Sequence, residues 1–358
     1  MAAIREANIE HSLGVPPQVF DEMNQKIEKI ENFVTVTLPH LPALLESGGP
    51  SVLKLIFDDI KGLIDSLDYR KLPVKKQNVL LMDLLFIESM LLNTKQEVVM
   101  ELSQLIEQLA QFLQRPAVLT FEDLIFLNLQ CEVPRTFSAG AVRKSELAFY
   151  QMNHDVDKKC ALGIEAIKTA MEALQIPGPA GITLAEAKIS AVADPFSEIG
   201  AIMQNGSKAL PREDFAKFRG YLTTHPVRNL KGPSGAFSGN VPLFELLLSG
   251  DKLPSEYVNY LIENLQYFPR NTQAQLKKFI EAEKMPTSLM SLAEGISGTE
   301  NLQEMLKKLG AGLKAFRAKH YAAVKHHIPE VISGAVAGTA GEADVSAFLR
   351  ARINMTIT

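Results

Sequence analysis

The stretch that decides the fold is Leu302–Val324, LQEMLKKLGAGLKAFRAKHYAAV. Its apolar side chains recur every three or four residues, a spacing that predicts one face of a long α-helix. His320 falls on that face, where the helix otherwise carries apolar side chains. A buried imidazole needs its ring nitrogens occupied by hydrogen bonds or by a metal, so this segment alone leaves both readings open. The face consists of Leu302, Leu306, Leu309, Leu313, Phe316, His320 and Val324.

Composition places the 358-residue chain among ordinary globular proteins, with 46% hydrophobic residues. Its net charge of −4 gives no field that would attract nucleic acid or an anionic membrane, which favours a small-molecule partner. Cys131 and Cys160 have no metal-binding spacing, and so few cysteines favour a reducing cytoplasm. The first residues lack the pattern of a signal peptide, and Asp83 and Glu88 interrupt the most apolar stretch. We therefore expect neither export nor membrane insertion.

Helical periodicity runs through most of the chain, whereas alternating runs of strand length are scarce, so we expect an all-α fold. The break at Arg115-Pro116 separates four amphipathic helices from a longer remainder. We expect a small N-terminal helical domain over 1–118 and a larger helical domain over 119–358. The periodicity predicts helices over 18–38, 51–67, 74–93, 96–114, 140–174, 211–223, 254–268, 272–283 and 300–327.

Two glycine-rich loops and one arginine are candidates for ligand binding. The loop at 231–240, KGPSGAFSGN, is expected to open a helix, and small residues there let the backbone approach a flat ligand. The loop at 337–342, AGTAGE, precedes a short predicted helix at 346–352; both loops are also compatible with simple turns. Arg219 shares a helix face with Phe215 and Leu222. Its planar fork suits a carboxylate, although a structural ion pair or extension to solvent remains open.

These segments, in this order, resemble the indoleamine 2,3-dioxygenase group of haem proteins, within the haem-dependent aromatic oxygenases. The resemblance is carried by DFAKFRGYL at 214–222, the Gly/Ser loop, FRAKH at 316–320, and GTAG at 338–341 followed by Phe348, Leu349 and Arg352. HLPALLESG at 40–48 is similar to a stretch of the same group. PRTFS at 134–138 and the GPSG loop leading into VPLF look closer to the branch with the pyrrolnitrin-pathway enzyme that rearranges chlorotryptophan.

The resemblance implies a haem-binding domain at 119–358 that holds haem b (iron protoporphyrin IX). His320 matches the axial ligand of the iron, and Arg317 an arginine near a haem propionate. Arg219 matches the arginine that binds the substrate carboxylate, and Phe215 a neighbouring pocket aromatic. The remaining positions match the loop over the distal face, the aromatic walls and a distal serine; they are Ser234, Gly235, Ala236, Phe237, Ser238, Phe121, Phe149 and Asn153.

Some positions depart from the dioxygenase pattern. Pro233, Phe237 and Gly239 stand where the dioxygenases carry small or polar residues, so Phe237 is placed to narrow or reshape the distal space. The loop at 337–342 lacks the threonine that follows the second glycine in the dioxygenases, and the chain has no tryptophan. The resemblance therefore implies haem binding more strongly than cleavage of tryptophan.

The function expected from the resemblance is a haem-dependent oxidoreductase acting on tryptophan or a related indole or aromatic amino acid. Three reactions stay open: dioxygenation with ring opening, oxidative rearrangement of a tryptophan derivative, and hydroxylation with peroxide. A haem sensor or carrier without turnover, and a scaffold without a cofactor, are the competing classes. The sequence leaves the oligomeric state open, since no coiled-coil repeat specifies association.

The other histidines are given lesser roles. His326 and His327 lie at the end of the predicted helix, where a cation is favoured by the helix dipole, and we interpret them as terminal caps. His154 adjoins Asn153 and is a minor candidate for the distal side. His225 precedes Pro226 in a loop, and we assign it no role.

Overall fold

The computed structural model describes residues 17–48, 58, 61–64, 67–280, 287–338 and 344–355. Within these ranges every regular element is helical, so the all-α prediction is confirmed. The chain divides into two compact units, Met1–Leu119 with Gln130–Arg143, and Thr120–Leu129 with Lys144–Thr358. The first division lies next to the expected boundary at 118. The return of 130–143 to the first unit has no counterpart in the sequence-based division.

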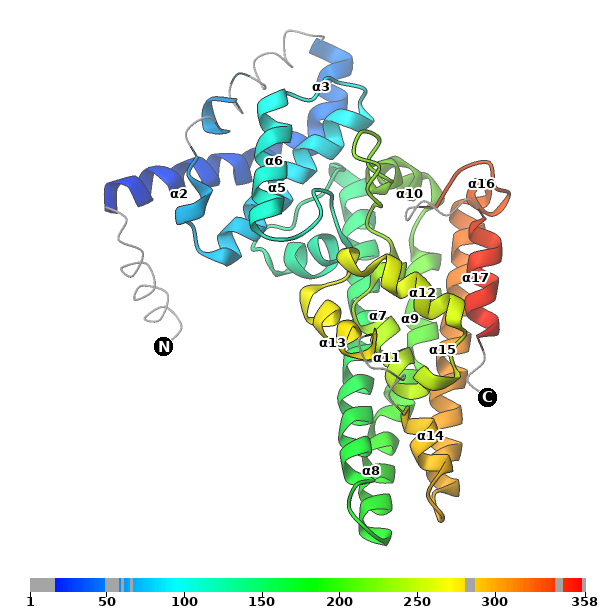
Figure 1. Cartoon of the computed structure of the whole chain (residues 1–358). Helices are drawn as coiled ribbons and strands as arrows, with labels where there is room; N and C mark the ends of the chain where they lie inside the picture. Colours follow the sequence, from blue (N-terminus) through cyan, green and yellow to red (C-terminus); the bar gives the residue numbers. More distant parts are fainter. Residues whose placement is uncertain are drawn as a thin grey trace. The chain divides into compact units, whose positions relative to one another are not determined.

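The first unit is built on helices that Figure 1 colours blue to cyan. A charge cluster around the buried Arg135 ties its later segment to them: Arg135 Nε donates to the buried Asp83 Oδ1 at 2.7 Å, and Nη2 donates to Oε1 of the partly exposed Glu31 at 2.9 Å. Burial raises the pKa of Asp83 to about 6, although Arg135 acts in the opposite direction. This cluster is the physical reason why 130–143 belongs to the first unit. The helices are α2 (Pro17–Asn32), α3 (Leu41–Gly48), α5 (Val74–Asn93) and α6 (Met100–Phe112).

The second unit holds the long helices and all of the candidate site. A π-helical segment, Glu122–Leu127, precedes α7, and single 3-10 turns join several of the later helices. The helices are α7 (Gly140–Ala173, whose first four residues belong to the first unit), α8 (Pro179–Ser197), α9 (Ile199–Ala209), α10 (Arg212–Arg219), α11 (Asn240–Ser249), α12 (Ser255–Glu263), α13 (Arg270–Ile280), α14 (Leu289–Glu294), α15 (Glu300–His327), α16 (Pro329–Ile332) and α17 (Val345–Asn354).

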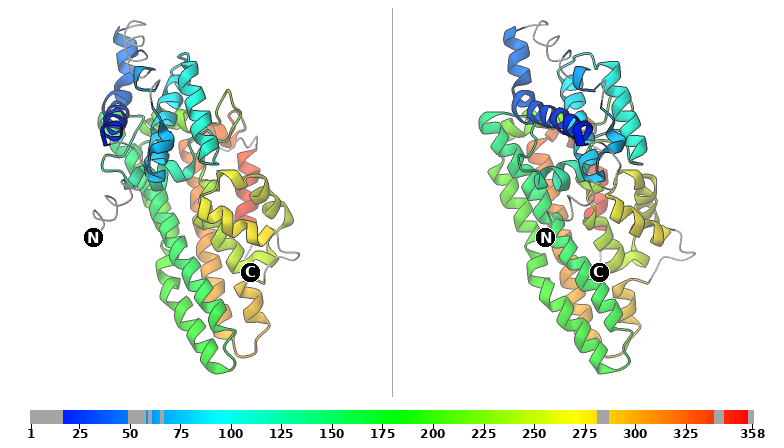
Figure 2. Two further views of the ribbon diagram at one scale, coloured as in Figure 1. Left: turned by 60° about the vertical axis from the view of Figure 1, so that its left-hand side comes forward. Right: turned by 90° about the vertical axis from the view of Figure 1, so that its left-hand side faces the viewer.

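Helix α15 has the apolar face that the sequence predicts for Leu302–Val324. It packs along α8 and α9, and Figure 2 shows these helices running side by side with α7. The apolar stripe enters the core of this bundle, because Leu302, Leu306, Leu309 and Leu313 are all completely or almost completely buried. Burial of each leucine side chain contributes roughly 1.5–3 kcal/mol to stability. Several such leucines on one helix therefore fix its rotation about its own axis. The same rotation decides where His320 points.

The structure agrees with some of the expected elements and differs from others. Helix α11 begins at Asn240 and α17 at Val345, as the two glycine loops predicted. Helices α8 and α9 were not predicted. The apolar periodicity of α8 is weak because the helix is rich in alanine, whereas α9 is amphipathic and was overlooked. Most of the predicted helix at 51–67, the end of the one at 272–283, and residues 339–343 of the second loop lie outside the described residues.

No helix in the described ranges is long and apolar enough to cross a bilayer.

A close contact in the second unit gives a test of its packing. A Cβ added to Gly163 of α7 meets Cε2 and Cδ2 of the Phe244 ring at 2.6 and 2.9 Å. Phe244 cannot move aside easily, because it is fully buried and its ring stacks on Phe196 at a centroid distance of 4.3 Å. We expect Gly163→Ala to lower the free energy of unfolding by about 1–3 kcal/mol in a denaturant titration.

The matched control is Gly312→Ala on α15. Its added Cβ meets Phe196 Cδ1 at 3.4 Å, an ordinary contact, and alanine favours the helix by up to about 1 kcal/mol. Equal effects of the two substitutions would contradict the packing described for Phe244.

Candidate functional site

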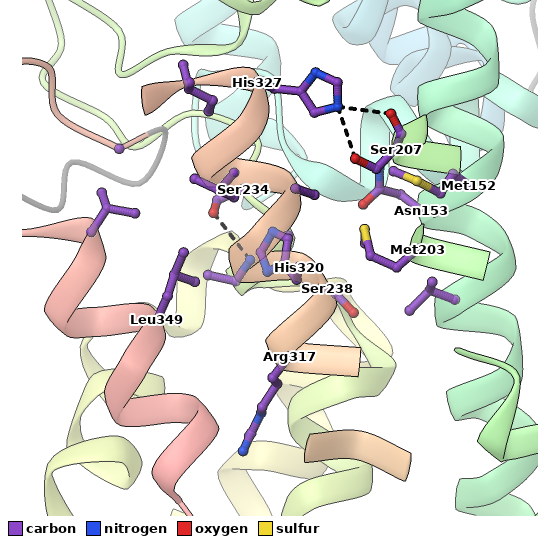
Figure 3. Close-up of a pocket in the computed structure, with 18 of the residues that line it drawn as sticks. Met152, Asn153, Met203, Ser207, Ser234, Ser238, Arg317, His320, His327 and Leu349 are labelled. Atoms are coloured by element: carbon purple, nitrogen blue, oxygen red, sulfur yellow. Dashed lines mark hydrogen bonds between the residues drawn. The ribbon is translucent and has the colours of Figure 1, made fainter. Parts of the chain in front are cut away.

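The second unit contains a cavity of about 190 Å³. Its walls come from α7, α9, α10, the Gly/Ser loop, α11, α15, α16 and α17, and most of the side chains that line it are apolar or aromatic. In Figure 3, labelled residues approach the cavity from α7 and α9 on one side and from α15 and α17 on the other, while Ser234 and Ser238 come from the Gly/Ser loop. Elements distant in the sequence therefore meet around one space.

His320 faces this cavity from α15 (Figure 3). Its ring lies parallel to that of Phe316, with the centroids 6.2 Å apart, and neither ring nitrogen is hydrogen-bonded to a residue in the described ranges. Burial, with Arg352 acting in the same direction, lowers the pKa of His320 to about 4. The imidazole is therefore neutral at physiological pH, and a nitrogen lone pair is available to a metal or to a hydrogen-bond donor.

The structure brings together nearly all of the residues that the sequence singled out. Phe237 alone among them does not line the cavity. Its ring stacks on Tyr267 at 5.1 Å and packs edge-on against Phe268 at 5.7 Å, so the expectation that Phe237 narrows the pocket is wrong for this cavity. In this 3-10 turn, neighbouring side chains point to different sides, and Ala236 takes the cavity side. The lining residues from the prediction are Phe121, Phe149, Asn153, Phe215, Arg219, Ser234, Gly235, Ala236, Ser238, Arg317 and His320.

Arg219 lines the cavity without an acidic partner among the described residues. Its Nη2 donates to the carbonyl of Ala337 at 3.4 Å, and its buried Nε has no hydrogen-bond acceptor in the described ranges. Burial lowers the pKa of Arg219, while Glu330 acts weakly in the opposite direction. A guanidinium with unused donors beside an apolar cavity is suited to binding an anion, and its geometry favours a carboxylate.

Aromatic rings form the wall beside this arginine. The ring of Phe149 lies 5.3 Å from that of Phe215 and 5.7 Å from that of Phe218, between centroids. Asn153 Nδ2 donates to the carbonyl of Phe149 at 2.8 Å, which fixes the amide so that Oδ1 remains an acceptor. This wall can stack on an aromatic ligand and accept one hydrogen bond from it.

The Gly/Ser loop is held against α7 by a buried carboxylate. Ser238 donates to Asp157 Oδ1 at 2.5 Å, and the backbone N–H of Asn240 donates to the same oxygen at 3.1 Å. Burial raises the pKa of Asp157, and these hydrogen bonds oppose that shift. Ser238 therefore anchors the loop and does not offer its proton to the cavity. Ser234 accepts from Ala236 N at 3.2 Å, and no acceptor for its own proton lies among the described residues.

Arg317 already has a carboxylate partner. Arg317 forms a buried ion pair with Glu245 of α11 and donates a hydrogen bond to the carbonyl of Arg352. Glu245 also accepts a hydrogen bond from the Tyr257 hydroxyl. A haem propionate at Arg317 would therefore lie beside a second carboxylate. Of the roles implied by the resemblance, this is the one that the geometry fits least.

His327 is the main site residue that the sequence reasoning missed. It was interpreted as a helix-terminal cap, but it is buried, lines the cavity, and packs its ring 5.4 Å from that of Phe215. The signal was present, since His327 continues the stripe three residues after Val324. Its neighbour His326 is exposed, and His154 and His225 lie outside the cavity lining.

No group of three His, Cys, Asp or Glu side chains suited to a metal ion occurs in the ranges that the structure describes. A haem iron needs only one axial side chain from the protein, and His320 is placed where it could supply one. Neither the protein-family models nor the curated proteins give a match to this chain. We therefore infer function from the residues and their geometry.

The buried pair at Arg317 gives a testable consequence. Arg317→Met leaves Glu245 buried without its cation, and we expect the free energy of unfolding to fall by about 3–5 kcal/mol. Replacing both partners, as Arg317→Met with Glu245→Leu, removes the uncompensated charge and is expected to recover most of that loss. Chemical denaturation of the three proteins measures it.

The control is Lys307→Met on the same helix. Lys307 forms an exposed pair with Glu304 at 3.0 Å, and exposed pairs contribute less than about 1 kcal/mol. If the single and double variants at Arg317 lose the same stability, the buried pair does not act as described.

Proposed function

We propose that this chain is a haem-dependent oxygenase that acts on tryptophan or a related aromatic amino acid. One observation carries the proposal. His320 presents an imidazole without a hydrogen bond to any described residue, in an aromatic-lined cavity that also holds Arg219 without an acidic partner. The first feature suits an axial ligand, and the second suits the carboxylate of an amino acid.

Haem b would be held by His320 and would supply the activation of dioxygen or peroxide that side chains lack. No hydrogen bond to a described residue has to break before a ring nitrogen of His320 can bind the iron. The apolar lining favours a macrocycle with apolar faces and keeps bulk water from the reacting centre.

The chain's own residues would bind and orient the substrate. Arg219 binds the carboxylate, Phe149 and Phe215 pack against the ring, and Asn153 Oδ1 accepts a hydrogen bond from a ring N–H. Fixing three parts of one small molecule places the ring in a single orientation relative to His320, which accelerates the reaction by removing rotational freedom. No side chain has to act as a base in this scheme.

The cellular setting belongs to the same proposal. Neither Cys131 nor Cys160 forms a disulfide within the described residues, which is compatible with a reducing cytoplasm. Ring opening, rearrangement and hydroxylation share the binding residues named above, and measurement of the product with dioxygen or peroxide distinguishes them.

Haem binding is tested by optical spectroscopy on protein reconstituted with ferric haem. We expect a Soret band shifted from that of free haem, and a loss of haem affinity of about tenfold or more in His320→Ala. The matched control, His326→Ala, changes an exposed histidine on the same helix and should leave the spectrum unchanged. A cofactor-free scaffold predicts no such band, and a spectrum unaffected by His320→Ala would overturn the assignment of the ligand.

Carboxylate recognition is tested with Arg219→Met. Losing a charge-assisted bidentate contact should weaken binding of tryptophan by about 10–100-fold, while tryptamine, which lacks the carboxylate, is affected little. Arg212→Met is the control, since Arg212 lies on the same helix and pairs with Glu330 at an exposed position. Oxidant consumption in the same samples separates the enzyme from a carrier, which binds these compounds without consuming oxidant.

A further inference from the structure

Ser207 and His327 form a second polar contact on the cavity wall. His327 Nε2 lies 3.0 Å from the Ser207 hydroxyl oxygen and 3.1 Å from the Ser207 carbonyl oxygen, as the dashed lines of Figure 3 show. Ser207 belongs to the last turn of α9, whose carbonyls lack partners within the helix. His327 thus links the end of α9 to α15, and both residues line the cavity.

The contacts determine which atom carries the proton. A carbonyl oxygen only accepts, and its contact with Nε2 is a hydrogen bond only when Nε2 carries the proton, so we assign the proton to Nε2. Nδ1 then bears a lone pair; it is buried and has no partner in the described ranges. Burial lowers the pKa of His327, with His326 and Arg212 acting in the same direction while the contact with Ser207 opposes it, which agrees with a neutral ring.

This proton assignment excludes Ser207 as a nucleophile activated by His327 and leaves it as a hydrogen-bond donor. With its proton on Nε2, His327 lacks the lone pair toward Ser207 that a general base for a nucleophilic serine needs. The Ser207 hydroxyl instead acts as a second acceptor for the same N–H. Its own proton has no acceptor among the described residues and is free to be donated to a ligand.

Arg219 lines the same cavity. The Phe215 ring contacts that of His327, and Phe215 and Arg219 are four residues apart on one face of α10. Ser207 and Arg219 therefore both bring an unused donor to the cavity, one neutral and one cationic. Two donors brought to one cavity favour a ligand group that accepts from both, such as a carboxylate.

We propose that Ser207 is a specificity-determining donor that binds, together with Arg219, the carboxylate of a ligand in this cavity. His327 is a positioning residue, because it fixes the Ser207 hydroxyl through Nε2–H. The inference rests on the proposed function for the site itself. The carboxylate belongs either to the amino acid or to a haem propionate, which share this chemistry.

Isothermal titration calorimetry of Ser207→Ala tests the proposal, with tryptophan and tryptamine as one pair of probes and haem and its dimethyl ester as the other. We expect about a tenfold weaker affinity for the carboxylate-bearing member of one pair and little change for its partner. The pair that responds identifies the source of the carboxylate. His327→Leu should reproduce the loss, whereas His327→Gln, which can still donate to Ser207, should restore part of it. Lys208→Ala, an exposed neighbour on α9, is the control.

The proposal is overturned if Ser207→Ala changes neither pair, or if it weakens both members of each pair equally. It is also overturned if the unmodified protein prefers neither tryptophan over tryptamine nor haem over its ester. If no haem spectrum depends on His320, the proposed oxygenase is contradicted, but the preference for tryptophan over tryptamine can still be measured. Failure of the oxygenase and failure of the Ser207 contact are therefore distinguishable.

Discussion

The rotation of α15 about its own axis is the constraint on which the rest of the site depends. Four leucines on one face of this helix are buried against α8 and α9, and turning the helix would expose them to water. The same face, continued toward the C-terminus, carries His320 and then His327. Packing energy far from the cavity therefore decides that two imidazoles are directed at it.

Polar contacts then hold the other walls in place. Asp157 fixes the Gly/Ser loop to α7 through Ser238 and Asn240, and the pair of Glu245 with Arg317 fixes α11 to α15. These buried carboxylates are each paired or hydrogen-bonded, as buried charge requires. His320 and Arg219 differ from them, because their nitrogens on the cavity side have no comparable partner among the described residues.

The fold class and much of the cavity could be predicted from the sequence because helical periodicity is a local property. The spacing of leucines in Leu302–Val324 defines one face of the helix, and side chains on one face point in the same direction. Arg219 with Phe215, and His320 with Phe316, were found in this way. The resemblance to haem oxygenases supplied Phe121 and Asn153, for which the sequence offers no local signal.

The remaining features depend on contacts between segments distant in the sequence. Phe237 turns away because Tyr267 and Phe268 provide an aromatic partner some thirty residues later. Ser238 is occupied by Asp157, and Arg317 by Glu245, so hydroxyl and guanidinium groups that look available in the sequence have internal partners. His327 was missed because its partner, Ser207, lies 120 residues earlier in the chain, and nothing local in the sequence shows that the two meet.

The most direct test of the central claim is the iron–histidine stretching band in the resonance Raman spectrum of the protein reconstituted with haem and reduced. We predict this band in the unmodified protein, its loss in His320→Gly, and its return when imidazole is added to fill the space left by the side chain. A band that persists in His320→Gly without imidazole would contradict the assignment of His320 as the ligand, because another residue would then hold the iron.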